Sequence, residues 1–558
     1  IRMLMLLACF AVAAYIAIAN DTGALPVPEA FSKKVDVNMY LFVNCIIGML
    51  ALFVSWNVVS TGISKLISFK SDCDTLCAVS IVSSVIGNAI LYANPALVQY
   101  GIAHVYTCAS ICVLLFNTFG KMMIVTRTQR SFRFVSGSCE KHVLFTVADE
   151  EKAQNFTRGT LRDFPRLVSM RRTEFLTDFL KTSYASDCTD KFCCLFVPII
   201  LIASLIVGIL AGLTIGFDGF YVGMSAFTGC IAMCSLLSMM LVVNLPLEMV
   251  SKKTAEVGGA VIGYDCIEEF ADTNSVLIDA AQLFPHGSVN LAAIKVFSDT
   301  RIDEAIVEAA SLTSQAGSIL KNMFYEIIAG KTELLNPVES YIYEDSMGLC
   351  GWIKNRRILL GSRELMESHN IEGLPTKSRE SEYSQGHEPV YLSISGNLAA
   401  MFVVDIISSR SVKKWVDRLV KKKVCIIVKS VDSFVTSEKI QKVYGLGSNT
   451  VKVIPKKLHE DFDAETKKSV RLSASMACAG KFSSMAQLIL GIKSVHTSAI
   501  IALIFQTASI LLGFGLSMML ILSKAFESNY IYMSATAMIV YNVLCTVLTC
   551  FAASTKKK

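Results

Sequence analysis

Long apolar runs dominate the pattern of hydrophobic and polar positions in this chain. A helix needs about 20 apolar residues to cross the core of a bilayer. The runs that approach or exceed this length are Met3–Ala19, Met39–Val59, Thr75–Gly120, Phe192–Phe217, Gly219–Leu247, Ser494–Leu522 and Ser528–Thr555. The third run is long enough for two helices, with a turn at Asn94-Pro95, so the pattern predicts eight spans. The first run also fits a signal peptide, because Arg2 precedes it and small residues follow it.

The composition agrees with a membrane protein. Of 558 residues, 53% are hydrophobic and 18% are charged, whereas a soluble protein carries about 25% charged residues. This excludes a single soluble domain, a disordered chain and a coiled coil. The net charge of +6 suits loops beside anionic lipid better than a nucleic-acid groove. We therefore expect the lipid bilayer as a partner and no nucleic acid.

Positive charge gathers on one side of the predicted spans. Twelve lysines and arginines lie between Thr126 and Lys191, and Lys65 and Lys70 lie between spans two and three. The tail ends in three lysines at 556–558. With eight spans all of these residues share one side, and positive loops face the cytoplasm. The sequence thus predicts cytoplasmic termini and cytoplasmic large loops. The 18 cysteines form no CxxC pair, so packing is the simplest interpretation of most of them.

The long block between spans six and seven alternates strand-like and helix-like segments. Ser275–Asp279 reads as a buried strand that ends in a carboxylate, and Val424–Val428 reads as a second one, shortly before Asp432. The amphipathic segment Val412–Lys423 precedes the second strand. This order predicts a parallel α/β sheet. Chemistry in such sheets lies beyond the carboxyl ends of the strands, where Asp279 and Asp432 fall.

The middle of this block shows further local signals. Helical periodicity runs through Ile302–Ile328, and Arg357–Gly361 is a strand followed by a short helix over Arg363–Ser368 that Ser362 can cap. Pro389–Ser395 and Leu398–Val404 alternate like the strands of a hairpin.

The order of these parts resembles the P-type ATPases, and within them the heavy-metal-transporting branch for copper, zinc and cadmium. Arg357–Glu367 looks like part of that family's nucleotide domain, Glu388–Asp405 like the hairpin behind it, and Pro455-Lys456-Lys457 like its proline–lysine signature. The resemblance implies a polytopic α-helical membrane protein with a cytoplasmic α/β phosphorylation-type, Rossmann-like or HAD-like domain and an inserted α+β nucleotide-binding-type domain. A bacterial plasma membrane is the expected location.

The resemblance also implies a division into domains. We expect four transmembrane helices in 1–125, a reduced actuator-like cytoplasmic domain in 126–191, helices five and six in 192–247, a phosphorylation-type domain in 248–493 (about 271–287 and 405–490) with the nucleotide-binding-type insertion at about 288–404, and helices seven and eight in 494–555.

The catalytic motifs depart from the family pattern. The phosphorylation motif Asp-Lys-Thr-Gly-Thr is replaced by Asp279-Ala-Ala-Gln-Leu283, and Thr-Gly-Asp becomes Ser430-Val-Asp432. The nucleophilic carboxylate of Asp279 remains, but the neighbouring side-chain donors are absent. Losing one such donor typically costs ~10²–10³ in rate. Asp279, Asp432 and Lys456 are therefore the candidate catalytic residues of a site that we expect to be inactive.

The metal and nucleotide machinery is reduced as well. No Gly-Asp-Gly-x-Asn-Asp run follows Pro455, and Glu460–Glu465 looks like a solvated helix start instead. No Thr-Gly-Glu-Ser occurs in Thr126–Lys191. Gly348 and Gly351 partly match the family's glycine motif, although a loop turn is the safer interpretation of these glycines. ATP and Mg²⁺ are thus implied as cofactors by the resemblance alone.

The sixth predicted span carries sulfur-rich positions where the family binds its metal. Cys230, Cys234, Met239 and Met240 are soft potential ligands for Cu(I), although cysteine and methionine also fill gaps between helices. Three hypotheses follow. The first is a pseudo-ATPase that acts as a regulator, a sensor or a scaffold, with an unknown protein partner. The second is a divergent ATP-driven heavy-metal transporter. The third is a transporter or channel that needs no ATP.

Overall fold

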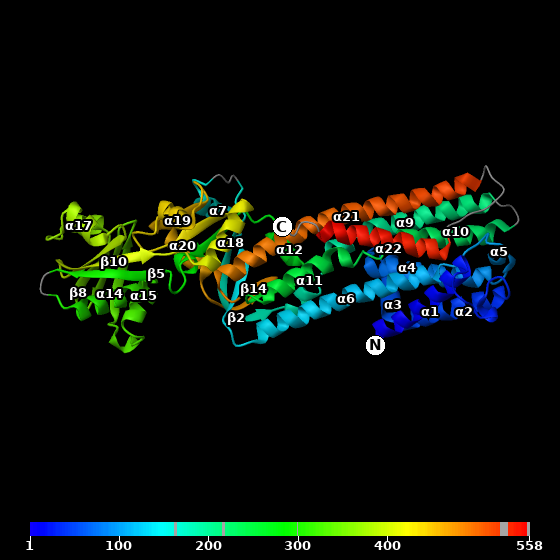
Figure 1. Ribbon diagram of the computed structural model, residues 1–558, viewed down its shortest axis with the longest axis horizontal. Coiled ribbons are helices and arrows are strands. Elements are labelled where there is room, and N and C mark those ends of the chain that lie inside the picture. The colour runs from blue at the N-terminus through cyan, green and yellow to red at the C-terminus, as the bar shows by residue number, and fades with distance from the viewer. Residues whose placement is uncertain (161–163, 215–217, 298–299, 525–533, 555–558) are drawn as a thin grey trace.

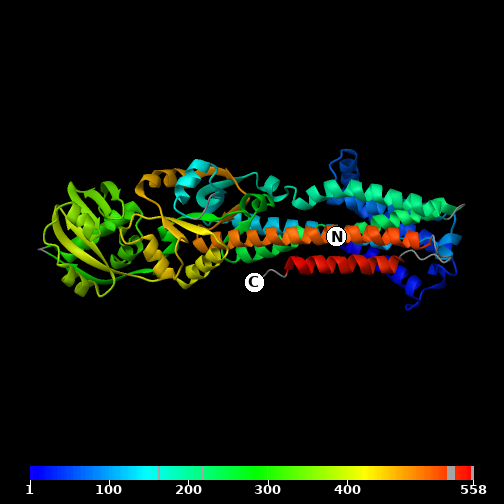
Figure 2. The same cartoon turned by 90° about the horizontal axis from the view of Figure 1, so that it is seen from above.

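The computed structural model describes residues 1–160, 164–214, 218–297, 300–524 and 534–554. The molecule is elongated, with a bundle of long helices at one end and two β-sheets at the other (Figures 1 and 2). Within the described residues, seven helices are long and apolar enough to cross a membrane. They are α1 (Arg2–Thr22), α2 (Val37–Val54), α4 (Cys73–Leu91), α6 (Thr107–Ser136), α9 (Cys188–Leu213), α21 (Phe482–Lys524) and α22 (Ala535–Ser554).

These helices correspond to seven of the eight predicted spans and make the chain an integral membrane protein. A short helix, α5 (Ala96–Gln99), lies in the turn expected at Asn94-Pro95. The second run is divided at Ser55 into α2 and an amphipathic helix, α3 (Trp56–Ile67). Parts of the predicted spans at 215–217, 528–533 and 555 lie outside the described residues.

The sixth predicted span, Gly219–Leu247, is not one helix. It consists of α10 (Gly219–Cys234) and α11 (Leu241–Ala255), and the buried segment Ser235–Met240 between them is non-helical. Irregular backbone at membrane depth is tolerated where protein surrounds it. Here the Ser238 hydroxyl donates a hydrogen bond to Gln506 Oε1 of α21 at 2.6 Å. This side-chain bond ties the non-helical segment to α21.

Helices α9 and α10 approach each other closely along a line of glycines. A Cβ atom added to Gly212 would lie 2.9 Å from the carbonyl oxygen of Gly219, and one added to Gly223 would lie 2.7 Å from that of Gly208. Small residues at such spacing let two membrane helices pack backbone to backbone. The pair therefore holds the broken sixth span against its neighbour.

The larger sheet, called the main sheet below, contains eight strands within the described residues. Their order is β12 (Val451–Val453), β11 (Cys425–Lys429), β4 (Ser275–Asp279), β2 (Leu167–Thr177), β1 (Lys141–Thr146), β14 (Met476–Cys478) and β3 (Gly259–Val261), with β13 (Ser469–Ser473) paired to β2. Strands β12, β11, β4 and β2 run parallel. The apolar runs of β4 and β11 are buried, as expected of central parallel strands.

Two strands of the main sheet come from the loop between α6 and α9. β1 and β2 pair with each other, β2 pairs with β4, and β1 pairs with β14. One short helix of this loop, α7 (Glu150–Thr157), lies between them in sequence. The division of the chain into domains stays a prediction, and the strands of residues 126–191 are hydrogen-bonded into the sheet that carries Asp279.

The second sheet is inserted in sequence between β4 and β11, and we call residues 289–406 the inserted lobe. Its described strands form an antiparallel sheet. The order is β5 (Val289–Val296), β10 (Asn397–Ile406), β9 (Glu388–Ile394), β8 (Arg356–Gly361), β7 (Gly348–Ile353) and β6 (Val338–Glu344). The predicted hairpin is β9–β10. The fold class is thus a polytopic helical membrane protein with an α/β domain and an inserted α+β domain.

The helix predicted over Ile302–Ile328 is two helices, α14 (Ile302–Ala316) and α15 (Lys321–Ile327). Gly317 ends α14 with a φ of 73°, a conformation that glycine adopts without a Cβ penalty. The turn that follows, at Ser318 and Ile319, faces the main sheet through the contacts described below.

Candidate functional site

Asp279 stands at the carboxyl end of β4 beside Lys429 at the end of β11, because the parallel pairing aligns the two residues. One Asp279 carboxylate oxygen accepts a hydrogen bond from the amide of Ala281 at 2.9 Å. Burial raises the pKa of Asp279, while the Ala281 amide and the charge of Lys429 act in the opposite direction. The Lys429 ammonium forms an ion pair with Asp463 at 2.5 Å. Its positive charge therefore acts on the carboxylates of both Asp463 and Asp279.

Asp432 lies near this edge and is almost fully buried. Its carboxylate accepts hydrogen bonds from the Ser318 hydroxyl, from the Ile319 amide at 3.0 Å and, more weakly, from the Ser430 hydroxyl at 3.4 Å. Burial raises the pKa of Asp432 to about 6; the bonds from Ser318 and Ile319 oppose the rise, and the charge of Asp279 adds to it. Ser318 and Ile319 belong to the α14–α15 turn, so the inserted lobe itself satisfies this carboxylate.

Two more contacts hold the inserted lobe on the main sheet. The rings of Tyr343 and His459 stack at 5.1 Å with an interplanar angle of 8°, and the amide of Lys456 donates to Asp345 Oδ1 at 2.6 Å. Burial lowers the pKa of His459, and the nearby charge of Lys429 lowers it further. The lobe is therefore closed onto the carboxyl edge of the sheet.

The predicted site residues take different places in this arrangement. Asp279 and Asp432 lie at the same edge of the sheet, as the strand order indicated. Lys456 takes part through its backbone amide, while the residue is exposed. Sequence reasoning missed Lys429 and Ser318, and it assigned Asp463 to a solvated helix start. The lysine that ends a predicted buried strand next to Asp279 was the one available signal.

Gly348 and Gly351 lie in β7, and both are buried. A Cβ on Gly348 would lie 2.4 Å from the carbonyl oxygen of Leu360, and one on Gly351 would lie 2.5 Å from Leu312 Cδ1. Close packing of β7 against β8 and α14 is enough to require both glycines. Their role in binding a nucleotide stays a prediction.

The residues around Asp279 do not fit Mg²⁺. A magnesium site needs several oxygen ligands, yet Asp279 and Asp463 share one lysine, and both oxygens of Asp432 already accept hydrogen bonds from Ser318 and Ile319. Among the residues that the structure describes, no group of three or more His, Cys, Asp or Glu side chains is arranged to hold a metal ion.

The sulfur-rich residues of the sixth span separate into two groups. Met239 and Met240 line a small cavity of about 10 Å³ together with residues of other helices. Cys230 and Cys234 lie outside the lining of this cavity, and Cys234 Sγ is 3.9 Å from the carbonyl oxygen of Ile510 on α21. The four candidate metal ligands are therefore not brought together at one point.

Two thiols and an amide that the sequence pattern did not mark as candidate ligands also line this cavity. Cys73 and Cys77 of α4 and Asn117 of α6 line it. Asn117 donates from its amide nitrogen to Asp74 at 2.9 Å, while its buried Oδ1 has no partner among the described atoms. Thiol and thioether sulfur atoms and one amide oxygen without a hydrogen-bond partner therefore meet at this cavity.

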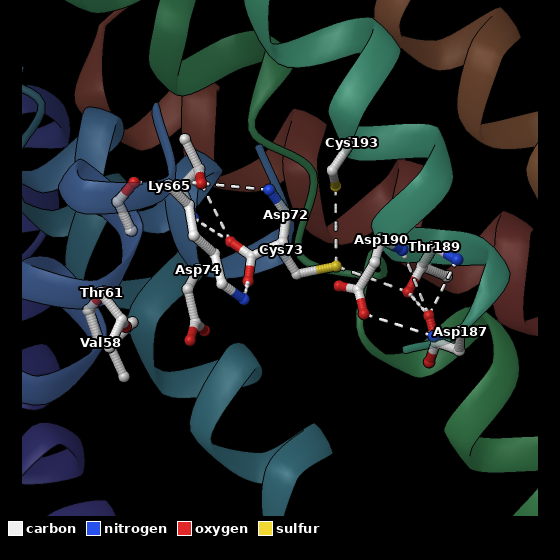
Figure 3. Close-up of polar contacts among 12 residues, drawn as sticks. Val58, Thr61, Lys65, Asp72, Cys73, Asp74, Asp187, Thr189, Asp190 and Cys193 are labelled. Atoms are coloured by element: carbon white, nitrogen blue, oxygen red, sulfur yellow. Dashed lines mark hydrogen bonds and ion pairs between the residues drawn. The ribbon is translucent and has the colours of Figure 1, made fainter. Parts of the chain in front are cut away.

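Figure 3 shows that the sulfur of Cys73 points to Cys193 on α9, at an Sγ–Sγ distance of 3.6 Å. The carboxylates around this pair have structural partners. Asp72 caps α4 and pairs with Lys65, and Asp187 caps α9 through the amide of Thr189 at 2.9 Å. Because 120 positions separate the two cysteines, no local sequence pattern indicated their contact.

No protein-family model matches this chain. Among solved structures, it resembles a zinc-transporting PIB-type ATPase in the E2·Pi state, with 11% identity, a TM-score of 0.48 and coverage of 99% of this chain and 98% of the other. It also resembles the catalytic domain of the CPx-ATPase CopB-B, with 12% identity, a TM-score of 0.27 and coverage of 43% and 98%. The N-domain of the copper-transporting P-type ATPase HMA6 matches with 15% identity, a TM-score of 0.17 and coverage of 21% and 100%. The predicted resemblance to heavy-metal P-type ATPases is confirmed.

Proposed function

We propose that this chain is a catalytically degenerate relative of the heavy-metal P-type ATPases, a membrane pseudo-ATPase with a sensing or regulatory role. The observation that carries this proposal is the closed contact at Asp432. The carboxylate is satisfied by Ser318 and Ile319 of the inserted lobe. Both oxygens of Asp432 thus already accept hydrogen bonds from the inserted lobe, and a metal ion that bound this carboxylate would compete with them.

The surroundings of Asp279 support the same conclusion. Attack of a carboxylate on a phosphate requires positive charge and donors around the transferring oxygens. Ala280, Ala281 and Leu283 provide no side-chain donor, and Lys429 is engaged by Asp463. A nucleophile without these groups faces the full charge repulsion of the phosphate.

Acid-stable labelling of the purified full chain from ATP labelled at the γ-phosphate tests this proposal. We expect wild type and Asp279→Asn to give the same background signal with copper, zinc, cadmium or cobalt present. An authentic heavy-metal ATPase run in parallel establishes that the assay reports a phosphoenzyme. Strong labelling of wild type that disappears in Asp279→Asn would support a divergent ATP-driven pump instead.

A second candidate function, binding or transport of a heavy-metal cation, is favoured by the cavity beside the broken sixth span. Soft thiolate and thioether ligands select Cu(I), and the cavity combines Cys73, Cys77, Met239 and Met240. Solved structures of similar fold are those of zinc- and copper-transporting ATPases. A pseudo-ATPase that senses such a cation needs this membrane site and no phosphoenzyme.

Competition between the purified chain and a Cu(I) chelator tests the membrane site. We expect Cys73→Ser and Cys77→Ser each to weaken Cu(I) binding by at least about tenfold, because each removes one of few thiolate ligands. Cys350→Ser is the matched control, since Cys350 is buried in the inserted lobe. Equal affinity in all four proteins would remove the metal-binding proposal.

The location follows the distribution of positive charge. We propose a bacterial plasma membrane with both termini and both sheets on the cytoplasmic side. Reporter fusions after Thr126 and Lys493 are expected to read inside, and a fusion after Lys34 is expected to read outside. An inside reading after Lys34 would contradict this topology.

A further inference from the structure

A pocket of about 450 Å³ opens where the helical bundle meets the main sheet. Its walls are α11, the first turns of α21, the end of α22 and one helix of the α/β part, α18 (Arg410–Lys421). Helix α18 packs against α21, and Figure 1 shows it beside the end of α21 that projects from the bundle. This pocket lies apart from Asp279, Asp432 and the cavity beside the sixth span.

The position of the pocket along the bundle marks it as a membrane-surface site. Cys550 lines it, four residues before the described end of α22 at Ser554. Helix α21 has 43 residues, about 65 Å at 1.5 Å per residue, which is roughly twice the hydrocarbon thickness. Its early residues in the pocket, from Gln487 to Ser498, therefore cross from the α/β side into the bilayer.

The two ends of the pocket differ in chemistry. The end on the bundle side is apolar, with Leu245 and Pro246 of α11 and Val495 of α21. The opposite rim carries cationic side chains and, in its lining, no carboxylate: Lys253, Arg418, Lys421 and Lys422. Such a gradient from apolar wall to cationic rim matches an amphiphile with a negative head group.

The cations of the rim are not engaged in ion pairs within the described part of the chain. None of Lys253, Arg418, Lys421 and Lys422 forms an ion pair there, and all four are exposed. The acids nearest in sequence to these cations, Glu256 and Asp417, are not part of the pocket lining. Glu248 of α11 is held by the Arg130 guanidinium at 2.6 and 3.1 Å. Cationic side chains without ion-pair partners beside an apolar wall attract an anion from outside the chain.

Trp415 completes the wall of the pocket. It is half-buried, and the Arg418 guanidinium lies 5.0 Å from its ring centre. Tryptophan favours the head-group level of a bilayer, where its ring is apolar and its N–H is wet. The stacking also orients Arg418 at the rim, where a phosphate can be bound by its fork of donors.

We propose that this pocket binds an anionic phospholipid from the leaflet on the α/β side of the membrane. The phosphate binds at Arg418, Lys421 and Lys422, and an acyl chain lies along Leu245 and Val495. Basic pockets between membrane helices recognise anionic head groups in this way. Because α18 directly precedes β11, the lipid contacts an element that leads to Lys429 and Asp432. This inference does not depend on the proposed function.

Native mass spectrometry of the detergent-purified full chain tests the proposal, with equimolar phosphatidylglycerol and phosphatidylcholine as probes. We expect wild type to retain the anionic lipid at least about fivefold over the neutral one, which is the effect of about one basic side chain near an anionic surface. The triple variant R418Q/K421Q/K422Q is expected to lose the preference. The control K321Q/K331Q/K354Q removes three exposed lysines of the inserted lobe and is expected to keep it.

A second measurement reports on the pocket itself. The chain has three tryptophans, so W56F/W352F leaves Trp415 as the sole indole. We expect phosphatidylglycerol with brominated chains to quench it more than brominated phosphatidylcholine does. Equal retention of both lipids by wild type, or an unchanged preference in the folded triple variant, would overturn the proposal. So would displacement of the lipid by millimolar inorganic phosphate, because the site would then take a free anion.

Discussion

The Ser318 hydroxyl donates a hydrogen bond to the carboxylate of Asp432, a residue 114 positions further along the chain. Ser318 belongs to the inserted lobe, and Asp432 follows strand β11 of the main sheet. The bond therefore joins the two parts of the molecule at the carboxyl edge of the sheet, where Asp279 also lies. The neighbouring amide of Ile319 reinforces it at 3.0 Å.

Replacing Ser318 with alanine is expected to loosen the inserted lobe. The change removes one donor to a buried carboxylate, which typically costs about 1–3 kcal/mol. Hydrogen exchange of the amides in α14 and α15 measures the opening of this contact. Ser378→Ala, at an exposed serine of the same lobe, is the control and should exchange like wild type. Equal protection in both variants would show that the lobe is held by other contacts.

The stability of the closed arrangement is expected to depend on pH through Asp432. Its folded pKa of about 6 lies above the ordinary 3.8, so between about pH 4 and 6 the folded protein binds more protons than the unfolded one. Stability therefore decreases as pH rises through this window, by at most roughly 3 kcal/mol for a shift of about two units. Thermal unfolding in detergent at pH 5 and 7.5 measures the effect.

The variant Asp432→Asn isolates this titration. We expect wild type to gain stability relative to Asp432→Asn when the pH falls from 7.5 to 5. A constant difference between the two proteins would mean that Asp432 does not titrate in this range.

Lys429 is expected to matter more than its ion-pair partner Asp463. Lys429→Met leaves both Asp279 and Asp463 without a nearby cation, whereas Asp463→Asn leaves Lys429 to neutralise Asp279. We expect Lys429→Met to lower the free energy of unfolding by about 1–3 kcal/mol. Asp463 is mostly exposed, so Asp463→Asn should cost less than about 1 kcal/mol. Chemical denaturation of both variants decides the order, and equal losses would contradict the shared-lysine arrangement.

Gly351→Ala separates packing from nucleotide binding. The added methyl group would lie 2.5 Å from Leu312 Cδ1 in the core of the inserted lobe, and such overpacking costs about 1–3 kcal/mol. Gly447→Ala is the control, because nothing lies within 4 Å of its Cβ position. We expect a lower melting temperature for Gly351→Ala alone. Unchanged stability with lost binding of a fluorescent ATP analogue would favour a nucleotide role for the glycine.

The sequence was informative where structure is local. The apolar runs of β4 and β11 and the turn residues between β9 and β10 are visible in a few consecutive positions, and these elements were predicted. The break of the sixth span was not, because Ser235–Met240 is as apolar as the helices on either side. Its conformation depends on Gln506, which lies on another helix.

Contacts between distant segments account for the rest. A Gly-Ser pair after a helix reads as a simple turn. The Ser318 hydroxyl accepts locally from the Leu320 amide, and its bond to Asp432 forms only because the lobe lies on the main sheet. Likewise, β2 pairs with β4 across more than 100 residues, from Leu167 to Ser275, and no periodicity in either strand reveals its neighbour. Cys73 and Cys193 meet in the same way. Each of these positions is fixed by tertiary packing rather than by propensity.

The pairing of β2 with β4 restricts how this molecule can move. Strands β1 and β2 are hydrogen-bonded into the sheet that carries Asp279 on two sides, β2 to β4 and β1 to β14. Movement of β1 and β2 away from this sheet would break their backbone hydrogen bonds to β14 and β4. Because β1 follows α6 and β2 precedes α9 in the chain, the backbone connects both membrane helices to the sheet that carries Asp279.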